Sequence, residues 1–399
     1  MHRVQTKKAC MVAYAFYEND ARIRRYVDSL IAKGWKVDII ALRTKNQSRF
    51  EVINGAKIYR IQTRERNEKN KWQYFFRILL FFWQSFFFLS RHHLRSPYSF
   101  IHVHSIPDFE VFATLLAKLI GAKIILDIHD LVPEFYSNKF NAQPGSFMVR
   151  ALLLLEKICC GFADQVIVAN DIWAEKLMIR SVKSTKCSAI INYPDLHIFH
   201  PLTHNAQEKN HFTLLYPGSL HYHQGVDLAI KAIAIVKEVI PQVKLHIYGD
   251  GPEKQNLLNL IKQLGLDYIV ELHEPVELSR IVRVMANADV GIVPKRADSF
   301  GNEAFSTKIM EFMAMGIPVI VSDTKIDRFY FDPSIVMFFQ AGNEHDLAEK
   351  VITLYHNPKL REQLAINSIN FIKDNNWQIK EKLYFRIINS VLGEKLLPE

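Results

Sequence analysis

Two glutamates, Glu303 and Glu311, stand eight residues apart in this sequence of 399 residues. They lie between two apolar, β-branched runs at 290–293 and 319–321, which are typical of buried parallel strands. Eight residues is a little over two helical turns, so both carboxylates can point the same way from one loop and helix. An acidic pair at the carboxyl edge of a parallel sheet suits the hydroxyl groups of a sugar or a ribose, because ionised carboxylates accept strong hydrogen bonds. A sugar nucleotide is therefore the first ligand to consider.

The elements that would position this pair alternate between strands and helices, as in a doubly wound α/β protein. Apolar runs predict strands over residues 8–16, 36–42, 58–61, 100–104, 123–128, 165–169, 212–216, 244–248, 269–272, 290–293, 319–321 and 335–339. A polar stretch with two prolines separates the two series of strands and predicts a hinge. We expect a first domain of residues 1–195, a linker of residues 196–211, a second domain of residues 212–375, and a C-terminal helical segment of residues 376–399. Ligands should bind in a cleft where the carboxyl ends of the two sheets face each other.

Composition indicates a folded protein with an anionic partner. Hydrophobic residues make up 49% of the chain and the formal net charge is +9. This charge favours a phospholipid surface or a nucleotide diphosphate, whereas nucleic acid is not expected because the basic residues are dispersed and no binding motif occurs. The four cysteines are irregularly spaced, which is typical of a reducing cytoplasm. The basic N-terminus has only a short apolar run, so it predicts a first strand and not a signal peptide.

Several short motifs follow one another in the C-terminal half in a characteristic order. They are YPGS at 216–219, HQGVD at 223–227, IYGDGP at 247–252, ADVGIVP at 288–294, and the block with Glu303 and Glu311. In this order they resemble the family-4 retaining glycosyltransferases of the GT-B fold, also called group 1 glycosyltransferases. The N-terminal half is similar through IILDIHD at 124–130 and ADQVIV at 163–168.

The resemblance implies an α/β protein of the GT-B fold, with two doubly wound Rossmann-like domains facing across a cleft. The N-terminal domain would bind the acceptor, the C-terminal domain would bind the nucleotide sugar, and the C-terminal helix would cross back to the N-terminal domain. The implied reaction transfers a sugar from a nucleotide diphosphate donor to a glycan or lipid-linked acceptor. The anomeric configuration would be kept, and no metal or other cofactor would be required.

The resemblance also gives roles to the acidic pair and to the residues between its members. Glu303 matches a catalytic glutamate that lies against the donor sugar, and Glu311 matches one that accepts from the ribose hydroxyls. Phe305, Ser306 and Thr307 stand near a predicted helix N-terminus, where backbone amides can hold the phosphate oxygens of the donor. Ser306 or Thr307 could equally be an ordinary helix cap.

Three glycines of the second domain are further candidates for donor binding. Gly218 follows a predicted strand, where the absence of a Cβ permits close approach of a diphosphate. Gly249 and Gly251 follow the next strand, where a plain turn is as good an explanation as a ligand-binding loop. The family pattern places an arginine just after the first glycine and a lysine just before Gly225, but this chain has Ser219 and Gln224 there.

The departing diphosphate still needs positive charge near it, because such stabilisation is usually the largest catalytic contribution. Lys308, Lys295 and Arg296 are the candidates. We favour Lys308 as the catalytic cation, because it lies one helical turn before Glu311 and can share its face. The alternative is an exposed helical lysine, and a chain with no cation at the phosphates would be an inactive homologue.

His129 ends the run IILDIHD, and the resemblance places a catalytic histidine of this kind over the donor sugar. Asp130 and Glu134 follow it and are candidates for binding acceptor hydroxyls. Asp20 and Arg22 open the first predicted helix and are further acceptor candidates, although Asp20 could equally cap that helix.

His102 and His104 alternate along a predicted strand. We interpret them as packing or cleft-lining residues, because no complementary cluster of metal ligands is evident in the sequence. No metal site is therefore predicted.

Residues 71–95 form a second distinctive segment, with seven phenylalanines and two tryptophans. The charge-free core at 78–90 has 13 residues, whereas a helix that crosses a bilayer needs about 20. Aromatic residues between basic ends suit a helix that lies in a membrane interface, so Trp72 to Arg95 is a candidate membrane contact. A helix buried against the sheet is the alternative, and one face could be buried while the other lies on lipid.

Together these features predict a peripheral-membrane, retaining glycosyltransferase of bacterial surface polysaccharide biosynthesis. We expect it in the cytoplasm, on the inner face of the cell membrane. A GT-B enzyme that acts on a sugar nucleotide without an acceptor, such as a 2-epimerase, is one alternative. A non-catalytic, membrane-associated homologue is the other, and the departures at Ser219 and Gln224 favour it.

Overall fold

The computed structural model describes residues 7–64, 71–140, 142–143, 145–202 and 210–394, without the side chains of residues 71 and 72. The chain divides into two compact units, Met1–Asn192 with Glu381–Glu399, and Tyr193–Lys380. The expected linker, residues 196–211, falls in the second unit, and its residues 203–209 lie outside the described part. Each unit is an α/β domain built on a largely parallel sheet, so the predicted fold class is confirmed.

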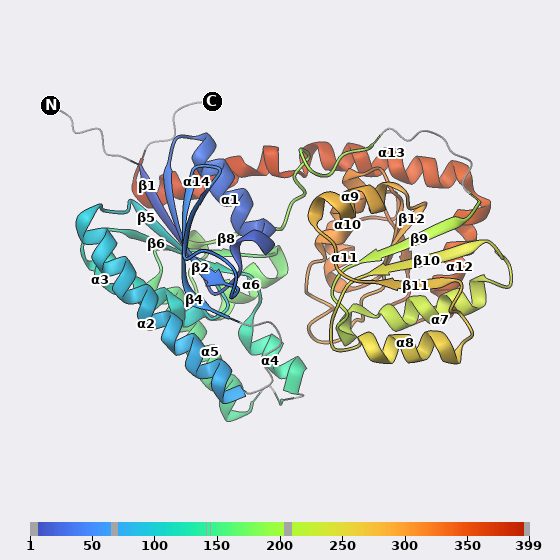
Figure 1. Cartoon of the computed structure of the whole chain (residues 1–399), viewed down its shortest axis with the longest axis horizontal. Coiled ribbons are helices and arrows are strands. Elements are labelled where there is room, and N and C mark those ends of the chain that lie inside the picture. The colour runs from blue at the N-terminus through green and yellow to red at the C-terminus, as the bar shows by residue number, and fades with distance from the viewer. Residues whose placement is uncertain (1–6, 65–70, 141, 144, 203–209, 395–399) are drawn as a thin grey trace. The chain divides into compact units, whose positions relative to one another are not determined.

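The first unit contains an eight-stranded sheet in the order β3-β4-β2-β1-β5-β6-β7-β8 (Figure 1). The strands are β1 Lys8–Ala13, β2 Lys36–Arg43, β3 Phe50–Ile53, β4 Ala56–Thr63, β5 Phe100–His104, β6 Lys123–Ile128, β7 Gln165–Val168 and β8 Cys187–Ala189. The helices and 3-10 turns are η1 Tyr17–Asn19, α1 Ala21–Ala32, α2 Lys71–Arg95, η2 Asp108–Thr114, α3 Leu115–Leu119, α4 Val132–Phe140, α5 Phe147–Phe162, α6 Asp171–Arg180 and η3 Ser184–Lys186. The strands that precede β1 in this order and those that follow it are added in opposite directions across the sheet, so the switch point lies between β1 and β5.

Two short strands of the first unit, β3 and β8, are absent from the strands predicted above. β3 pairs with β4 in the antiparallel sense, and the turn between them uses Asn54 (φ 50°) and Gly55 (φ 88°). Asn-Gly is the dipeptide that favours such a turn, since both residues adopt positive φ. This dipeptide was the sequence signal that could have revealed β3.

The second unit contains a six-stranded parallel sheet in the order β11-β10-β9-β12-β13-β14. The strands are β9 Phe212–Pro217, β10 Val243–Tyr248, β11 Val270–His273, β12 Val290–Val293, β13 Val319–Ser322 and β14 Met337–Phe339. The helices are η4 Tyr222–Gln224, α7 Val226–Val236, α8 Lys254–Gln263, α9 Leu278–Ala286, α10 Thr307–Ala314, α11 Lys325–Tyr330, α12 Glu344–His356 and α13 Pro358–Asp374. The order reverses between β9 and β12, and ligands of such sheets bind at the carboxyl ends of the strands on either side of this point.

Helices of the second unit cover its sheet on both faces. On one face α7, α8 and α12 pack over the sheet, and Val290 and Ile292 of β12 belong to this core. Successive strand residues point to opposite faces, so Gly291 points to the other face, where the ring of Phe312 from α10 lies. A Cβ at Gly291 would lie 2.6 Å from carbons of that ring. Glycine at this position therefore lets α10 sit close to the sheet and positions the residues at its N-terminus.

The C-terminal helix α14 Trp377–Leu392 begins in the second unit and ends in the first. Its Tyr384 is buried in the first unit, 4.3 Å from Tyr26 between ring centres, and its hydroxyl lies 3.0 Å from Nδ1 of His102. Glu381 accepts a hydrogen bond from the Ser29 hydroxyl of α1 at 2.8 Å. The predicted return of this helix to the first domain is confirmed.

Helix α2 carries apolar residues on both its buried face and its exposed face. The buried face consists of Ile78, Phe81, Ser85, Leu89 and His93. The exposed face consists of Phe76, Leu80, Trp83, Phe87 and Leu94. The helix thus packs on the unit through one face, while contact of the other face with lipid stays a prediction. Among the described residues, no helix is both long enough and apolar enough to span a membrane.

Candidate functional site

The switch point of the second sheet brings Gly218 and Lys308 together. Gly218 follows β9, and a Cβ at this glycine would lie 2.9 Å from Nζ of Lys308, which comes from α10. Nζ of Lys308 also donates to Oε1 of Gln224 at 3.3 Å. The hydroxyl of Tyr216 donates to the carbonyl of Ser219 at 2.8 Å and lies 3.2 Å from Oε1 of Gln224. A lysine from α10 therefore lies at the loop where the family pattern would place an arginine and a lysine.

The environment of Lys308 weakens its hold on a proton. Burial lowers the pKa of its ammonium from the ordinary 10.5 to about 8, although the carboxylate of Glu311 one turn later acts in the opposite direction. Burial deprives this ammonium of water, so a bound anion would stabilise its charge strongly. The cluster of Gly218, Gln224 and Lys308 is suited to a phosphate group.

Lys308 is the second residue of α10, so the N-terminus of this helix adds backbone N–H donors next to it. Ser306 is the N-cap residue, but its side chain makes no capping hydrogen bond. Its side chain is buried, and Oγ has no hydrogen-bond partner among the described residues. Thr307 is the first helical residue, and Phe305 before the cap packs its ring against Tyr330 at 5.0 Å between centres. Ser306 thus occupies the N-cap position without the side-chain hydrogen bond that an ordinary serine cap makes.

Glu303 and Glu311 occupy different elements. Helix α10 begins only at Thr307, so Glu303 lies in the preceding turn, where its backbone N–H donates to the carbonyl of Phe300 at 3.1 Å. Its carboxylate lies 3.7 Å from Nζ of Lys325. Glu311 lies within α10, one turn after Lys308. The direction of the first carboxylate is therefore set by the turn and not by a continuous helix.

The other two candidate cations of the donor site have structural partners. Lys295 is 2% exposed; its Nζ lies 3.0 Å from Oδ2 of Asp327 and donates to the carbonyl of Ala304 at 2.7 Å. These contacts tie the turn before α10 to α11, so Lys295 is a positioning residue. Arg296 donates from Nη2 to both carboxylate oxygens of Asp227, at 2.7 and 2.6 Å. Both residues thus have carboxylate partners, and their binding of the donor stays a prediction.

Gly249 and Gly251 are required by packing between two loops. A Cβ at Gly249 would lie 1.9 Å from the carbonyl oxygen of Gly218, and one at Gly251 would lie 2.5 Å from that of Leu220. The N–H of Leu220 donates to the carbonyl of Asp250 at 2.9 Å. These two glycines therefore let the loop of residues 218–220 pack closely against the loop after β10, and this packing positions Gly218.

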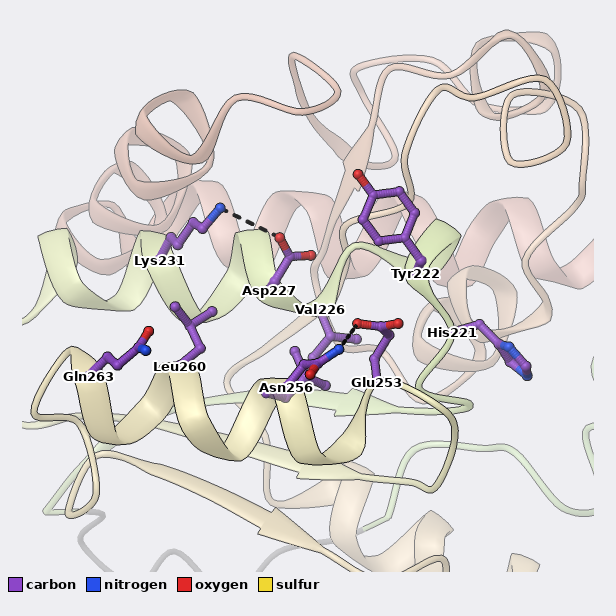
Figure 2. Close-up of a pocket in the computed structure, with 10 residues that line it drawn as sticks. His221, Tyr222, Val226, Asp227, Lys231, Glu253, Asn256, Leu260 and Gln263 are labelled. Atoms are coloured by element: carbon purple, nitrogen blue, oxygen red, sulfur yellow. Dashed lines mark hydrogen bonds and ion pairs between the residues drawn. The ribbon is translucent and has the colours of Figure 1, made fainter. Parts of the chain in front are cut away.

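A hollow of about 280 Å³ lies beside this region, between α7 and α8 (Figure 2). Asp227 and Lys231 line it from α7 and form an ion pair, while Asn256, Leu260 and Gln263 line it from α8. Among the described residues that line it, none belongs to the predicted catalytic set. Asp227 is paired with Lys231, and the Glu253 carboxylate accepts a hydrogen bond from Asn256, so we do not assign the donor to this hollow.

In the first unit, His129 is the outer member of a buried polar cluster at the carboxyl end of β6. Its Nε2 lies 3.5 Å from Oδ2 of Asp127 and 3.2 Å from Nδ1 of His104. Burial alone would lower the pKa of His129, but the charge of Asp127 and its hydrogen bond outweigh burial and raise the pKa. The side chain of His129 is 22% exposed, whereas those of Asp127 and His104 are buried. His129 can therefore meet a ligand while Asp127 orients its ring.

Arg22 and Asp20 both have partners within the first unit, and Asp20 caps its helix as one of the two alternatives expected. Arg22 is buried and forms a bidentate pair with Asp127, Nε to Oδ2 at 2.8 Å and Nη2 to Oδ1 at 2.7 Å. This guanidinium and the neighbouring His129 hold the pKa of the Asp127 carboxyl well below its usual range, although burial alone would raise it. Asp20 caps α1 by accepting from the N–H groups of Arg22 and Ile23, both at 3.0 Å.

The acidic residues that follow His129 also differ from each other. Glu134 accepts two hydrogen bonds from Arg180, at 2.6 and 3.0 Å, and Arg180 also binds Glu156. Through Arg180, Glu134 joins α4 to α5 and α6, and its contact with an acceptor stays a prediction. Asp130 stays next to His129, and burial raises the pKa of its carboxyl, although the charge of His129 acts against this.

Asp127 is the residue of this cluster to which the sequence interpretation gave no role. It stands inside the run IILDIHD, where an acidic residue within an apolar strand must find a buried partner. That unusual position was the available signal. Its partner, Arg22, could not be identified without the fold, because 105 residues separate the two.

Comparison with known proteins agrees with this fold and these motifs. The family described as glycosyl transferases group 1 matches residues 203–371, and the glycosyl transferase 4-like domain matches residues 20–192. Among solved structures, sucrose-phosphate synthase from Thermosynechococcus elongatus superposes with a TM-score of 0.78 at 18% identity, covering 96% of this chain and 100% of that one. HepE from Anabaena in complex with UDP and glucose gives 0.70 at 15% identity, covering 96% and 99%. The two family matches together span both halves of the chain, which therefore belongs to the group 1, family-4-like glycosyltransferases of the GT-B fold.

Curated relatives match this chain over parts of their lengths. A D-inositol 3-phosphate glycosyltransferase from Arthrobacter sp. is 27% identical over 172 residues, which is 42% of this chain and 40% of the relative. The putative glycosyltransferase EpsD of Bacillus subtilis is 24% identical over 291 residues, 67% of this chain and 70% of the relative. The chain thus spans less than half the length of the first relative.

Proposed function

We propose that this protein is a retaining glycosyltransferase that takes a sugar from a nucleotide diphosphate sugar. The observation that carries the proposal is the position of Lys308, with Nζ directly over Gly218 and beside Gln224. The departing diphosphate would lie between this ammonium and the N-terminus of α10, where the Oγ of Ser306 would donate to a phosphate oxygen. HepE was solved with UDP-glucose, which makes uridine donors the first to test.

The reaction that these groups serve breaks the bond between C1 of the sugar and the diphosphate oxygen. The acceptor hydroxyl then forms its bond to C1 on the same face, and its proton passes to the departing phosphate oxygen. Lys308 and the backbone amides of α10 stabilise the negative charge that develops there. Glu303 would accept from a hydroxyl of the donor sugar, Glu311 from the ribose, and His129 would orient a sugar hydroxyl. We propose that the reaction proceeds without a metal, because these groups supply the positive charge.

The function is tested by binding and by product analysis. A thermal-shift panel of UDP, GDP and ADP should raise the unfolding midpoint with at least one nucleotide, because a ligand that binds only the folded state stabilises it. Transfer from the matching sugar nucleotide to an acceptor should give a product with the anomeric configuration of the donor by NMR, and should persist in EDTA. Inversion would refute the retaining mechanism. An isomerised sugar nucleotide formed without acceptor would establish the epimerase alternative, and nucleotide binding without any turnover would establish the non-catalytic one.

We further propose that α2 rests on an anionic membrane surface, where a glycan or lipid-linked acceptor of bacterial surface polysaccharide synthesis would be presented. Phe76, Trp83 and Phe87 are 64%, 53% and 65% exposed, an unusual exposure for aromatic side chains at helical spacing. Arg91 and Arg95 near the end of the helix supply positive charge for acidic head groups. The side chain of Trp72, at the start of the predicted contact, lies outside the described residues. This surface would place the protein on the cytoplasmic face of the membrane.

Vesicle flotation tests this contact. Phe81 is fully buried, so its replacement would destabilise the fold; the exposed pair Trp83→Ser and Phe87→Ser is the proper variant. Wild-type protein should float with vesicles that contain phosphatidylglycerol, and the double variant should remain at the bottom of the gradient. Ile179→Ser with Tyr268→Ser, at positions that are 87% and 89% exposed, is the matched control and should float like wild type. Failure of the wild type to float, or flotation of the Trp83/Phe87 variant, would refute the membrane contact.

A further inference from the structure

Three side chains with metal-binding atoms meet at the β10–β11 edge of the second sheet. His246 of β10 pairs directly with Glu271 of β11, and Tyr248 pairs with His273. Residues that face each other across paired strands, and residues two apart in one strand, point to the same face of a sheet. The two imidazoles and the carboxylate therefore project from one face. These residues are not part of the proposed donor site, whose strands β9 and β12 lie on the other side of β10.

The three ligand atoms already have the spacing of a tetrahedral metal site. Nδ1 of His246 lies 3.1 Å from Nε2 of His273, and Oε2 of Glu271 lies 3.5 and 3.4 Å from these two nitrogens. A tetrahedral Zn²⁺ with bonds of about 2.0 to 2.1 Å separates its ligand atoms by about 3.3 to 3.4 Å. We propose that His246, Glu271 and His273 bind a divalent transition-metal cation such as Zn²⁺. The fourth position would hold a water molecule.

Access and rigidity both favour this site. The side chains of His246, His273 and Glu271 are 26%, 32% and 44% exposed, so an ion can enter from solvent and keep one water. The ring of Tyr248 stacks on His273 with 4.3 Å between centres and 19° between planes, which restricts the ring. The neighbouring cation, Lys244, donates a hydrogen bond from its ammonium group to the carbonyl of Tyr268. Little reorganisation is therefore needed for an ion to bind.

A second set of similar residues, His102, His104 and Asp127 in the first unit, does not support a metal. There the carboxylate of Asp127 is already bound by both Nε and Nη2 of Arg22, so a metal cation would have to displace a buried guanidinium. In the proposed site, by contrast, the partners of the Glu271 carboxylate among the described residues are the imidazoles of His246 and His273, so no guanidinium has to be displaced. The difference in electrostatic environment decides between the two clusters.

Metal binding has a structural consequence next to the predicted donor loop. The N–H of Gly249 donates to the carbonyl of His273 at 3.1 Å, immediately after Tyr248 ends β10. An ion held by His246 and His273 would cross-link the ends of β10 and β11 from which this loop emerges. The inference does not depend on the proposed donor site, because it concerns binding of the ion alone.

Titration calorimetry of the full-length, tag-free, chelator-treated protein tests the site with ZnCl₂, with MgCl₂ as the comparison. Zn²⁺ should bind this cluster while Mg²⁺ should not compete, because imidazole ligands favour zinc over magnesium. His273→Gln and Glu271→Gln should each weaken the zinc affinity at least about 10-fold, since even residues behind the ligands change affinity by this much. His197→Gln, an exposed histidine of the same unit, is the control and should bind as wild type does.

Two outcomes of the calorimetry would overturn the inference. One is a wild-type protein that binds no zinc, and the other is a His273→Gln protein that binds it with wild-type affinity. Circular dichroism of the metal-free variants should match wild type, because both side chains are partly exposed. Co²⁺ gives an independent readout: a tetrahedral site with two nitrogen ligands should produce visible absorption bands that are lost in His273→Gln. An unchanged spectrum in that variant would also contradict the proposal.

Discussion

Replacing Lys308 with methionine should have opposite effects on folding and on ligand binding. Methionine keeps much of the apolar stem but removes the ammonium that lies over Gly218. In the free protein the pKa of Lys308 is lowered by burial from 10.5 to about 8, so the folded state holds the charged form reluctantly at pH 7. One pKa unit corresponds to about 1.36 kcal/mol, which would put the cost of this charge near 3 kcal/mol. Solvent screening of a partly exposed group reduces it to roughly 1 to 3 kcal/mol.

The sign follows from proton binding. Between pH 8 and 10.5 the unfolded chain keeps the proton of this lysine while the folded chain has lost it, so wild-type stability should rise across this window relative to Lys308→Met. At pH 7 the variant should be more stable than wild type by the full difference. Loss of one charged contact to the diphosphate should nevertheless weaken nucleotide binding roughly 10- to 100-fold, because hydrogen bonds to charged groups contribute about 1.5 to 3 kcal/mol.

Urea unfolding from pH 7 to 10, without ligand, measures the first effect, and calorimetry with the best nucleoside diphosphate measures the second. Lys262→Met, at an exposed position of α8 in the same unit, removes the same charge and should change neither stability by more than about 0.5 kcal/mol nor affinity. A Lys308→Met protein that binds the diphosphate as tightly as wild type would refute the assignment of Lys308 to the phosphates. Equal stability of both proteins at pH 7 would refute the desolvation of the ammonium.

Three further predictions concern other parts of the structure. Glu303→Gln should lower turnover roughly 10²- to 10³-fold while leaving nucleoside diphosphate affinity unchanged, because the proposed partner of Glu303 is the sugar. Glu349→Gln, on the exposed surface, is the control. Wild-type turnover in Glu303→Gln would contradict the assignment. Asp127→Asn should destabilise the protein by about 3 to 5 kcal/mol, because it leaves a buried arginine unpaired. It should also lower the pKa of His129, measured by NMR titration. An unchanged pKa would show that Asp127 is not the partner of His129. Gly291→Ala should cost about 1 to 3 kcal/mol in urea unfolding, and a neutral effect would mean that α10 packs less closely than described.

Apolar periodicity predicted most of the sheet architecture, because buried parallel strands are near-continuous β-branched runs whatever packs on them. The runs at 100–104, 123–128 and 290–293 match β5, β6 and β12 in both bounds. The two strands that were not predicted, β3 and β8, are short edge strands of the first sheet. Edge strands bury less apolar surface, so hydrophobic pattern marks them weakly, and only the Asn-Gly turn carried a signal for β3.

The sequence by itself determined the family, the alternation of strands and helices, and the block in which the acidic pair and its neighbouring cations stand. It could not decide among Lys295, Arg296 and Lys308, because these residues have the same formal charge within 14 positions. Tertiary structure distinguishes them through partners distant in sequence: Asp327 and Asp227 bind the first two, while the third lies at Gly218, which is why we propose Lys308. The physical reason is that the free energy of a charge depends on its desolvation and its nearest opposite charges, which chain folding alone brings together.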